Sequence, residues 1–160
     1  MYRFNNNNNN YGRNTSVPGE NYTLEISDYG PQPFVINMKN ASIQNQAYRS
    51  TLWTGEYFQV TLMSILPGGD VGLEIHPDTD QLFIVEQGKG YAVTGPHQNN
   101  LTFRAPIFEN YAVIIPANTW HNIVNTGNTP LKLMSLYAPP HHPAGTVHIT
   151  KADSEAEYHE

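Results

Sequence analysis

Short β-rich runs separated by turn residues recur along most of this chain, and they constrain its fold more than any other feature. Gly, Pro and Asn occupy nearly every gap, as in Pro67-Gly68-Gly69 and Gly127-Asn128. Nine or ten short strands at this spacing predict an all-β sandwich or barrel, and a two-sheet jelly roll is the economical arrangement. The runs span residues 34–38, 51–66 (two strands), 71–76, 81–87, 90–94, 101–107, 111–115, 119–125 and 131–137.

The length and composition agree with one β domain. The chain has 160 residues, of which 39% are apolar and 14% charged, with 12 Gly and 12 Pro. This size suits a single closed core. We expect residues 1–20, which are Asn-rich, to form a flexible arm, and residues 21–150 to form the domain. Helix is expected only in residues 151–160, as a short helix or a frayed tail.

The charge and the residue types that are absent exclude several classes of function. The net charge is −6, from 14 acidic and 8 basic residues, and no run of Lys or Arg occurs, so nucleic acid and anionic membranes are not expected partners. The chain has no Cys, which excludes disulfides, thiolate nucleophiles and Cys-based zinc sites. The sequence shows no signal-like apolar segment at its start and no apolar stretch of about 18 residues, and we therefore expect a cytoplasmic protein.

Four side chains able to bind a metal occur at informative positions. Residues two apart on a strand face the same way, so Glu74 and His76 are expected to point together into the barrel. The turn that follows can bring Gln81, at the start of the next strand, beside them. His121 lies in a later strand-like run and can close the site from a neighbouring strand. These four residues form our candidate metal site.

Two segments resemble the two motifs of the cupin superfamily. The first cupin motif runs Gly, five residues, His, one residue, His, three or four residues, Glu, six residues, Gly. In this sequence Gly68 and Gly88 match the framing glycines and His76 matches the second His. Glu74 replaces the first His, and Gln81 replaces the Glu.

The second motif is also present with substitutions. Pro116, His121 and Asn125 match it, while Asn110 and Asn118 stand where the family has Gly. Asn is the best substitute at a turn position that needs a positive φ. The resemblance implies a double-stranded β-helix, or jelly-roll barrel, that holds one divalent metal ion. The chain is also similar to small bacterial cupins labelled as sugar-phosphate isomerases, of the mannose-6-phosphate isomerase-like type.

The candidate ligands define the kind of metal and the kind of chemistry. One carboxylate, two imidazoles and a neutral amide oxygen suit Mn, Fe(II), Ni, Co or Zn, and leave the choice among them open. In six-coordinate geometry four protein ligands would leave two positions for water or a bidentate substrate. The alternative for Glu74 and Gln81 is a polar network in a barrel without a metal.

Three function classes follow. The first is a metal-dependent isomerase or lyase acting on a small polar metabolite such as a sugar or sugar acid, with oxygen-dependent chemistry at Fe(II) as a variant. Glu74 is the candidate general base if it is not a ligand. The second is a module that binds a small molecule without turnover. The third is a structural barrel that assembles into dimers through its edge strands. A homodimer is the expected state of the chain, and dimerisation is compatible with all three classes.

The remaining polar residues are given structural roles. Asp78 and Asp80 are expected to stabilise a turn, and Asn125 to satisfy backbone groups at a strand end. Three further histidines follow the last strand in a Pro-rich segment, and we expect them to lie in solvent rather than fold over the barrel mouth. They are His141, His142 and His148.

Overall fold

The computed structural model describes residues 25 and 27–157, so the arm predicted for residues 1–20 lies outside the described part of the chain. The described residues form two helices and nine strands. They are α1 (Met38–Gln44), β1 (Arg49–Thr54), β2 (Gln59–Ile65), β3 (Asp80–Gln87), β4 (Gly90–Gly95), β5 (Phe103–Ile107), β6 (Ala112–Ile115), β7 (Trp120–Asn125), β8 (Leu131–Ala138), β9 (Val147–His148) and α2 (Lys151–Glu157).

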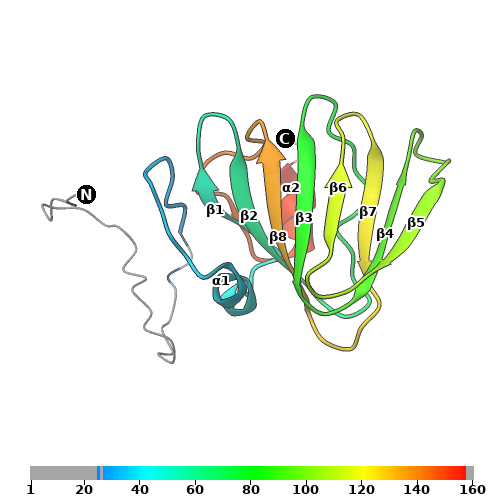
Figure 1. The fold of residues 1–160 in the computed structure, drawn as a ribbon, viewed down its shortest axis with the longest axis horizontal. Coiled ribbons are helices and arrows are strands. Elements are labelled where there is room, and N and C mark those ends of the chain that lie inside the picture. The colour runs from blue at the N-terminus through cyan, green and yellow to red at the C-terminus, as the bar shows by residue number, and fades with distance from the viewer. Residues whose placement is uncertain (1–24, 26, 158–160) are drawn as a thin grey trace, which may run out of the picture.

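The strands form two sheets that face each other (Figure 1). The larger sheet has the order β6-β3-β8-β2-β1-β9 and the smaller one the order β5-β4-β7, with antiparallel pairing throughout. Some strands that are neighbours in a sheet are distant in sequence, such as β2 and β8. The chain therefore makes crossover connections within the barrel. The predicted jelly-roll, or double-stranded β-helix, is confirmed.

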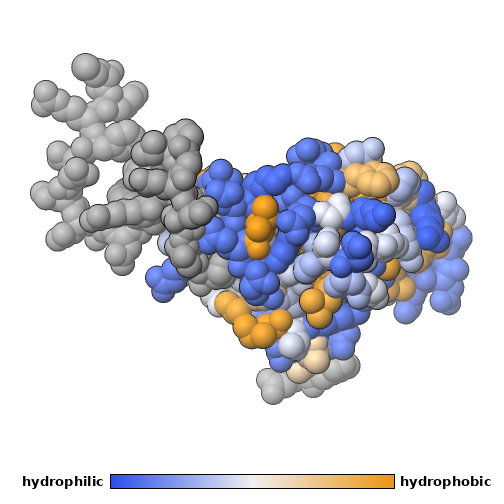
Figure 2. Space-filling view, turned by 90° about the horizontal axis from the view of Figure 1, so that it is seen from below, coloured by the Kyte–Doolittle hydropathy of each residue, from blue (hydrophilic) through white to orange (hydrophobic). Residues whose placement is uncertain are grey.

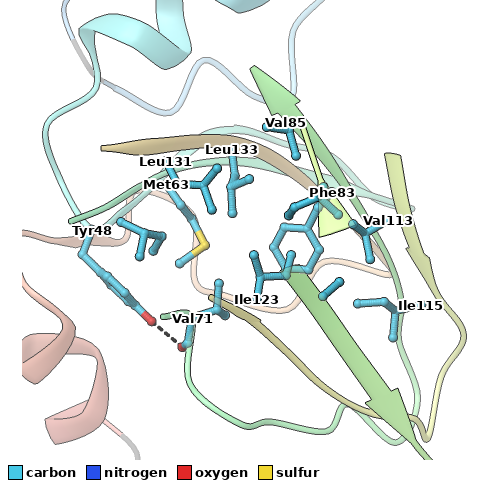
Figure 3. Packing of buried hydrophobic residues seen from close by; sticks show 13 residues of the cluster. Tyr48, Met63, Val71, Phe83, Val85, Val113, Ile115, Ile123, Leu131 and Leu133 are labelled. Carbon is cyan, nitrogen blue, oxygen red and sulfur yellow. Dashed lines mark hydrogen bonds between the residues drawn. The ribbon is translucent and has the colours of Figure 1, made fainter. Parts of the chain in front are cut away.

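The main core fills the space between the two sheets (Figure 3). It forms because inward residues alternate with outward ones: Gln81, Phe83 and Val85 are buried along β3 while the residues between them are half-buried. The hydroxyl of Tyr48 donates a 2.6 Å hydrogen bond to the carbonyl of Val71 at the edge of this core. The core residues are Tyr48, Met63, Ile65, Val71, Phe83, Val85, Ala92, Ile107, Val113, Ile115, Ile123, Leu131 and Leu133.

The strand predicted for 34–38 is wrong, and a helix that was not predicted begins beside it. Asn37 caps α1, since its side chain accepts a 3.1 Å hydrogen bond from the Asn40 backbone N–H. Phe34 and Ile36 pack against Leu52 and a second cluster on the outer side of the larger sheet. The alternating apolar pattern here reflects contact with a sheet face rather than strand pairing.

The strand predicted for 71–76 is also wrong as a continuous strand. Gly72 has a φ of +92°, which interrupts the extended backbone. Only isolated bridges join this segment to β7 in the described structure, at Asp70 with Val124 and at Glu74 with His121. The segment around Glu74 nevertheless stays paired to β7, and this pairing positions the site.

The surface of the described residues gives two further facts. On the face drawn in Figure 2, hydrophilic residues predominate and apolar side chains form separate small groups, which is ordinary for a folded domain. Neither helix in the described part of the chain is long and apolar enough to cross a bilayer.

Candidate metal centre

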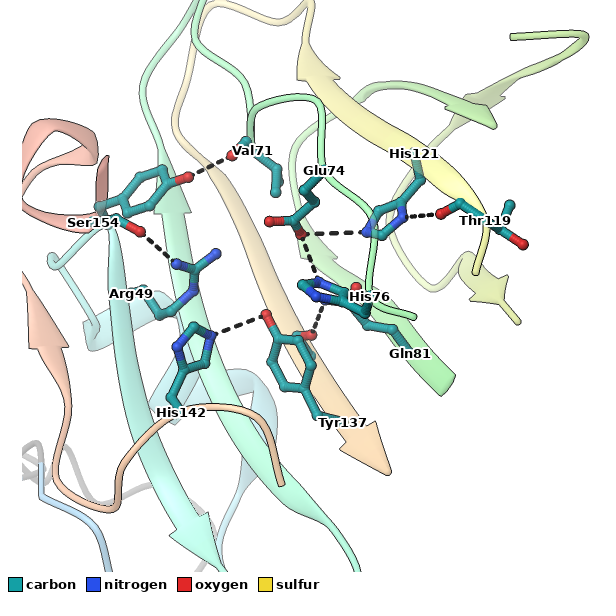
Figure 4. Close-up of polar contacts among 12 residues, drawn as sticks. Arg49, Val71, Glu74, His76, Gln81, Thr119, His121, Tyr137, His142 and Ser154 are labelled. Atoms are coloured by element: carbon teal, nitrogen blue, oxygen red, sulfur yellow. Dashed lines mark hydrogen bonds and ion pairs between the residues drawn. The ribbon is translucent and has the colours of Figure 1, made fainter. Parts of the chain in front are cut away.

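The fold brings all four predicted ligands together at one end of the space between the sheets (Figure 4). Glu74 and His121 are held by reciprocal backbone hydrogen bonds, 3.0 Å from the Glu74 N–H and 2.9 Å from the His121 N–H. His121 continues the inward face of β7 that also carries Ile123. Gln81 is the first inward-facing residue of β3.

The ligand atoms converge on one point. Oε1 of Glu74 lies 3.3 Å from Nε2 of His76 and 3.3 Å from Nε2 of His121. One donor atom from each of these three residues lies within 4.8 Å of the others, a grouping that could hold a metal ion. The side chains of His76, His121 and Glu74 are 6%, 1% and 19% exposed, so water has little access to the donors.

The hydrogen bonds around the donors leave lone pairs directed at this point. Nδ1 of His121 lies 2.8 Å from the Thr119 carbonyl, which can only accept, so Nδ1 carries the proton and Nε2 is the ligating nitrogen. The amide nitrogen of Gln81 donates to the Ser135 hydroxyl at 3.1 Å. This leaves the Gln81 Oε1 atom buried without a hydrogen-bond partner, and Nε2 of His76 is buried with only the Glu74 carboxylate, 3.3 Å away, beside it.

Such orphaned acceptors are costly in a folded interior unless something satisfies them. A divalent cation would do so, since amide oxygen, carboxylate and imidazole are all suitable donors. The residues present therefore fit the metal that the sequence predicted.

The electrostatics favour an ionised carboxylate at the site. Burial alone would raise the pKa of Glu74, but the hydrogen bond with His121, the adjacent His76 and the charge of Arg49 together hold that pKa well below its usual range. An ionised Glu74 is the form that binds a cation. It is a poor candidate for the general base that the sequence suggested.

Four turn positions of the two motifs have a positive φ, as predicted for the two Asn residues. Gly68 and Gly88 have φ of 78° and 94°, and Asn110 and Asn118 have φ of 71° and 60°. All four lie in the left-handed region that Gly and Asn tolerate best. The side chain of Asn125 donates to the carbonyls of Ile65 and Thr129, each at 2.9 Å, which confirms its role at a strand end.

Comparison with known proteins agrees with this geometry. Residues 61–137 match the family model described as the cupin domain. The crystal structure of BH2720 from Bacillus halodurans superposes with a TM-score of 0.81 at 56% identity, covering 82% of this chain and 99% of that one. The chain belongs to the cupin superfamily.

Other relatives of this cupin extend the comparison. The uncharacterized protein YrkC of Bacillus subtilis (strain 168) is 54% identical over 137 residues, which make up 86% of this chain and 74% of that protein. The cupin domain of Schizosaccharomyces pombe Cnp3 is 18% identical with a TM-score of 0.52, covering 60% of this chain and 66% of that one. At that identity the likeness shows the fold alone.

A cavity of about 490 Å³ opens beside the ligands of this cupin. Glu74 and His76 form part of its wall, and several residues that sequence reasoning did not select complete it. Among these are Tyr48, Arg49 and His141. Tyr48 and Arg49 carried no motif signal, since they lie about 25 residues before the first ligand.

The expectation that the late histidines lie in solvent is wrong. His142 and His148 are buried, with 6% and 7% exposure, and His141 is half-buried. The ring of His141 lies 4.3 Å from that of His76 and stacks on Tyr137 at 5.4 Å, measured between centroids. Gln59 holds this segment, because its side chain accepts from the His142 N–H at 3.0 Å and donates to the His142 carbonyl at 2.8 Å. The Pro-rich segment therefore folds over the barrel mouth.

Burial of His142 predicts a pH-dependent stability. Burial first, and then the charge of Arg49, lower the pKa of His142 from 6.5 to about 2. As the pH falls below 6.5, the imidazole of His142 takes up a proton in the unfolded chain but not in the folded chain. The folded state therefore has its full stability relative to the unfolded state above pH 6.5 and loses stability as the pH falls below that value. Between pH 7 and pH 5 we expect a loss of about 2 kcal/mol in unfolding free energy from this residue.

Urea denaturation at the two pH values measures the effect. The variant His142→Gln keeps a polar side chain but cannot titrate. Between pH 7 and pH 5 its unfolding free energy should fall by about 2 kcal/mol less than that of the unmodified protein. Equal losses in both proteins would show that His142 is not held neutral in the folded state.

Proposed function

We propose that this cupin binds one divalent metal ion through Glu74, His76, Gln81 and His121, and that it is an isomerase or lyase-like enzyme acting on a small polar metabolite such as a sugar or sugar acid. The observation that carries the proposal is the convergence of donor atoms with unsatisfied lone pairs beside a cavity of about 490 Å³. Cavities of this size accommodate small metabolites.

The donor set supports Mn, Fe, Ni, Co or Zn. A bound divalent ion supplies Lewis-acid chemistry, which polarises a carbonyl or enediolate oxygen. An isomerase or lyase step of this kind also needs a group that moves a proton. Glu74 is unsuited to this task, because both imidazoles of the site lie against its carboxylate.

His141 is our candidate for the proton-moving group. It lines the cavity, and burial followed by the nearby His76 lowers its pKa to about 4, so its imidazole is neutral at pH 7 and can accept a proton. The Tyr48 hydroxyl donates to the Val71 carbonyl, and its pKa is raised by burial, so it serves as a hydrogen-bond donor rather than a base. Both side chains lie on the wall beside Glu74 and His76.

A screen for metal-dependent turnover tests the proposal. Metal-loaded and chelator-treated protein would be incubated with sugars and sugar acids, and the products followed by NMR. We expect conversion of at least one compound that is lost on chelation and restored by adding metal back. The variant His141→Gln should convert that compound at least about tenfold more slowly while retaining the metal.

Two other outcomes would decide against the enzyme. Saturable binding of a compound to the metal-loaded protein without turnover would support the alternative, a cupin that captures a small molecule. Conversion that survives chelation would contradict the metal-dependent mechanism. A homodimer and a cytoplasmic location remain predictions of the sequence.

A further inference from the structure

Ser135 contacts the side chain of Gln81 from the neighbouring strand. It lies on the inward face of β8 and is fully buried. The register of β3 and β8 places Gln81 opposite Tyr137 and Phe83 opposite Ser135, so Gln81 and Ser135 are diagonal neighbours across the strand pair. Nε2 of Gln81 donates a 3.1 Å hydrogen bond to the hydroxyl oxygen of Ser135. Ser135 belongs to neither of the two motifs that contain the proposed ligands.

The amide group of Gln81 has two chemically different ends. Its oxygen offers lone pairs to a cation, whereas its nitrogen carries two hydrogens and acts only as a donor. Oε1 is buried without a hydrogen-bond partner, while Nε2 is held by Ser135. If the amide turned over by half a rotation, the oxygen and the nitrogen would exchange places and the site would lose a ligand. The orientation of Gln81 therefore decides whether it can bind a metal.

A carboxylate at the same position would not need to be oriented. The first cupin motif has Glu where this chain has Gln81. Both oxygens of a carboxylate accept hydrogen bonds and bind cations, so such a side chain serves as a ligand whichever way it is turned. An amide serves only in one orientation, and it needs a neighbour that accepts from its nitrogen. Ser135 is that neighbour in this structure.

We propose that Ser135 is a positioning residue of the metal centre, which accepts from Nε2 of Gln81 and so leaves Oε1 to bind the metal. This inference rests on the proposed metal site and adds to it a residue that does not bind the metal itself. With the metal bound, Oε1 is committed to the ion and Nε2 needs an acceptor of its own. Without the Ser135 hydroxyl the nitrogen would be buried and unsatisfied, which disfavours the metal-bound state.

Removal of the Ser135 hydroxyl tests the inference. In Ser135→Ala we expect the affinity for Zn(II), measured by competition with a chromophoric chelator, to fall by about tenfold or more, as the loss of an outer-shell partner commonly causes. Thr61→Val is the matched control, because Thr61 lies opposite Ser135 on β2, is fully buried and has a hydroxyl without a hydrogen-bond partner. It should bind Zn(II) as the unmodified protein does. Unchanged affinity in a folded Ser135→Ala variant would overturn the inference.

A double-mutant cycle shows whether Ser135 acts through Gln81. In the variant Gln81→Glu the carboxylate can bind the metal in either orientation. Adding Ser135→Ala to this variant should therefore weaken Zn(II) binding by a factor that is at least about threefold smaller than the factor beside Gln81. A serine that only fills space in the core would cause the same loss in both backgrounds. Equal losses would contradict the positioning role.

The unmodified protein separates this failure from that of the proposed function. If it binds no Zn(II) in the same competition experiment, the metal site itself is wrong and the inference fails with it. If it binds Zn(II) and Ser135→Ala binds the ion equally tightly, the metal site stands and the positioning role of Ser135 is wrong.

Discussion

Replacement of His121 by alanine is expected to weaken metal binding at least about 100-fold. His121 is 1% exposed, and its ring is oriented by the 2.8 Å contact between Nδ1 and the Thr119 carbonyl, so Nε2 is a preorganised ligand. Loss of a mere outer-shell partner commonly costs 10- to 100-fold in metal affinity, and the loss of a ligand should cost more. Competition with a chromophoric chelator measures the affinity directly.

His97→Ala is the matched control, because His97 is exposed and belongs neither to the group of metal-capable donors nor to the lining of the cavity. It should bind metal as the unmodified protein does. Metal should also raise the thermal midpoint of the unmodified protein and of His97→Ala, but not that of His121→Ala, since only a state that binds metal is stabilised by it. Undiminished affinity in a folded His121→Ala variant would exclude this residue as a ligand.

Replacement of Phe83 by alanine is expected to lower the free energy of unfolding by about 3–5 kcal/mol. Phe83 is fully buried on the inward face of β3, and its ring lies 6.4 Å from that of His121, measured between centroids. The cavity left behind would remove core contacts from both sheets and packing from the metal ligand. The total free energy of unfolding of a domain of this kind is only about 5–15 kcal/mol, so a loss of this size is large.

Urea denaturation checks this expectation. Phe103→Ala serves as the control, because Phe103 is 57% exposed on the edge strand β5 and its loss should cost less than about 1 kcal/mol. If Phe83→Ala lowered the free energy of unfolding no more than Phe103→Ala does, Phe83 would not be part of the apolar core that joins the two sheets.

The parts of the structure that the sequence predicts are those governed by local rules. Alternation of inward and outward residues reveals β3 and β7, and with them the inward positions of Gln81 and His121. Backbone sterics alone predict a positive φ at Asn110 and Asn118, and both residues have one. Glu74 and His76 meet because an extended segment places residues two apart on one side, even though Gly72 breaks the strand.

The parts that sequence reasoning missed depend on contacts between distant segments. Phe34 alternates with Ile36 as in a strand, yet the segment packs on the outer face of the larger sheet. His142 is buried because Gln59, 83 residues away, bonds its backbone. Arg49 enters the cavity because Ser154, 105 residues away, fixes its guanidinium. No periodicity or motif encodes such pairings, so only the folded chain reveals them.

The metal content of the purified protein, determined by elemental mass spectrometry beside a His76→Ala, His121→Ala double variant, tests the central claim most directly. We predict close to one equivalent of Mn, Fe, Ni, Co or Zn per chain in the unmodified protein and its loss in the folded double variant. Absence of metal from both proteins, even after reloading with each ion, would contradict the metal centre and the function built on it.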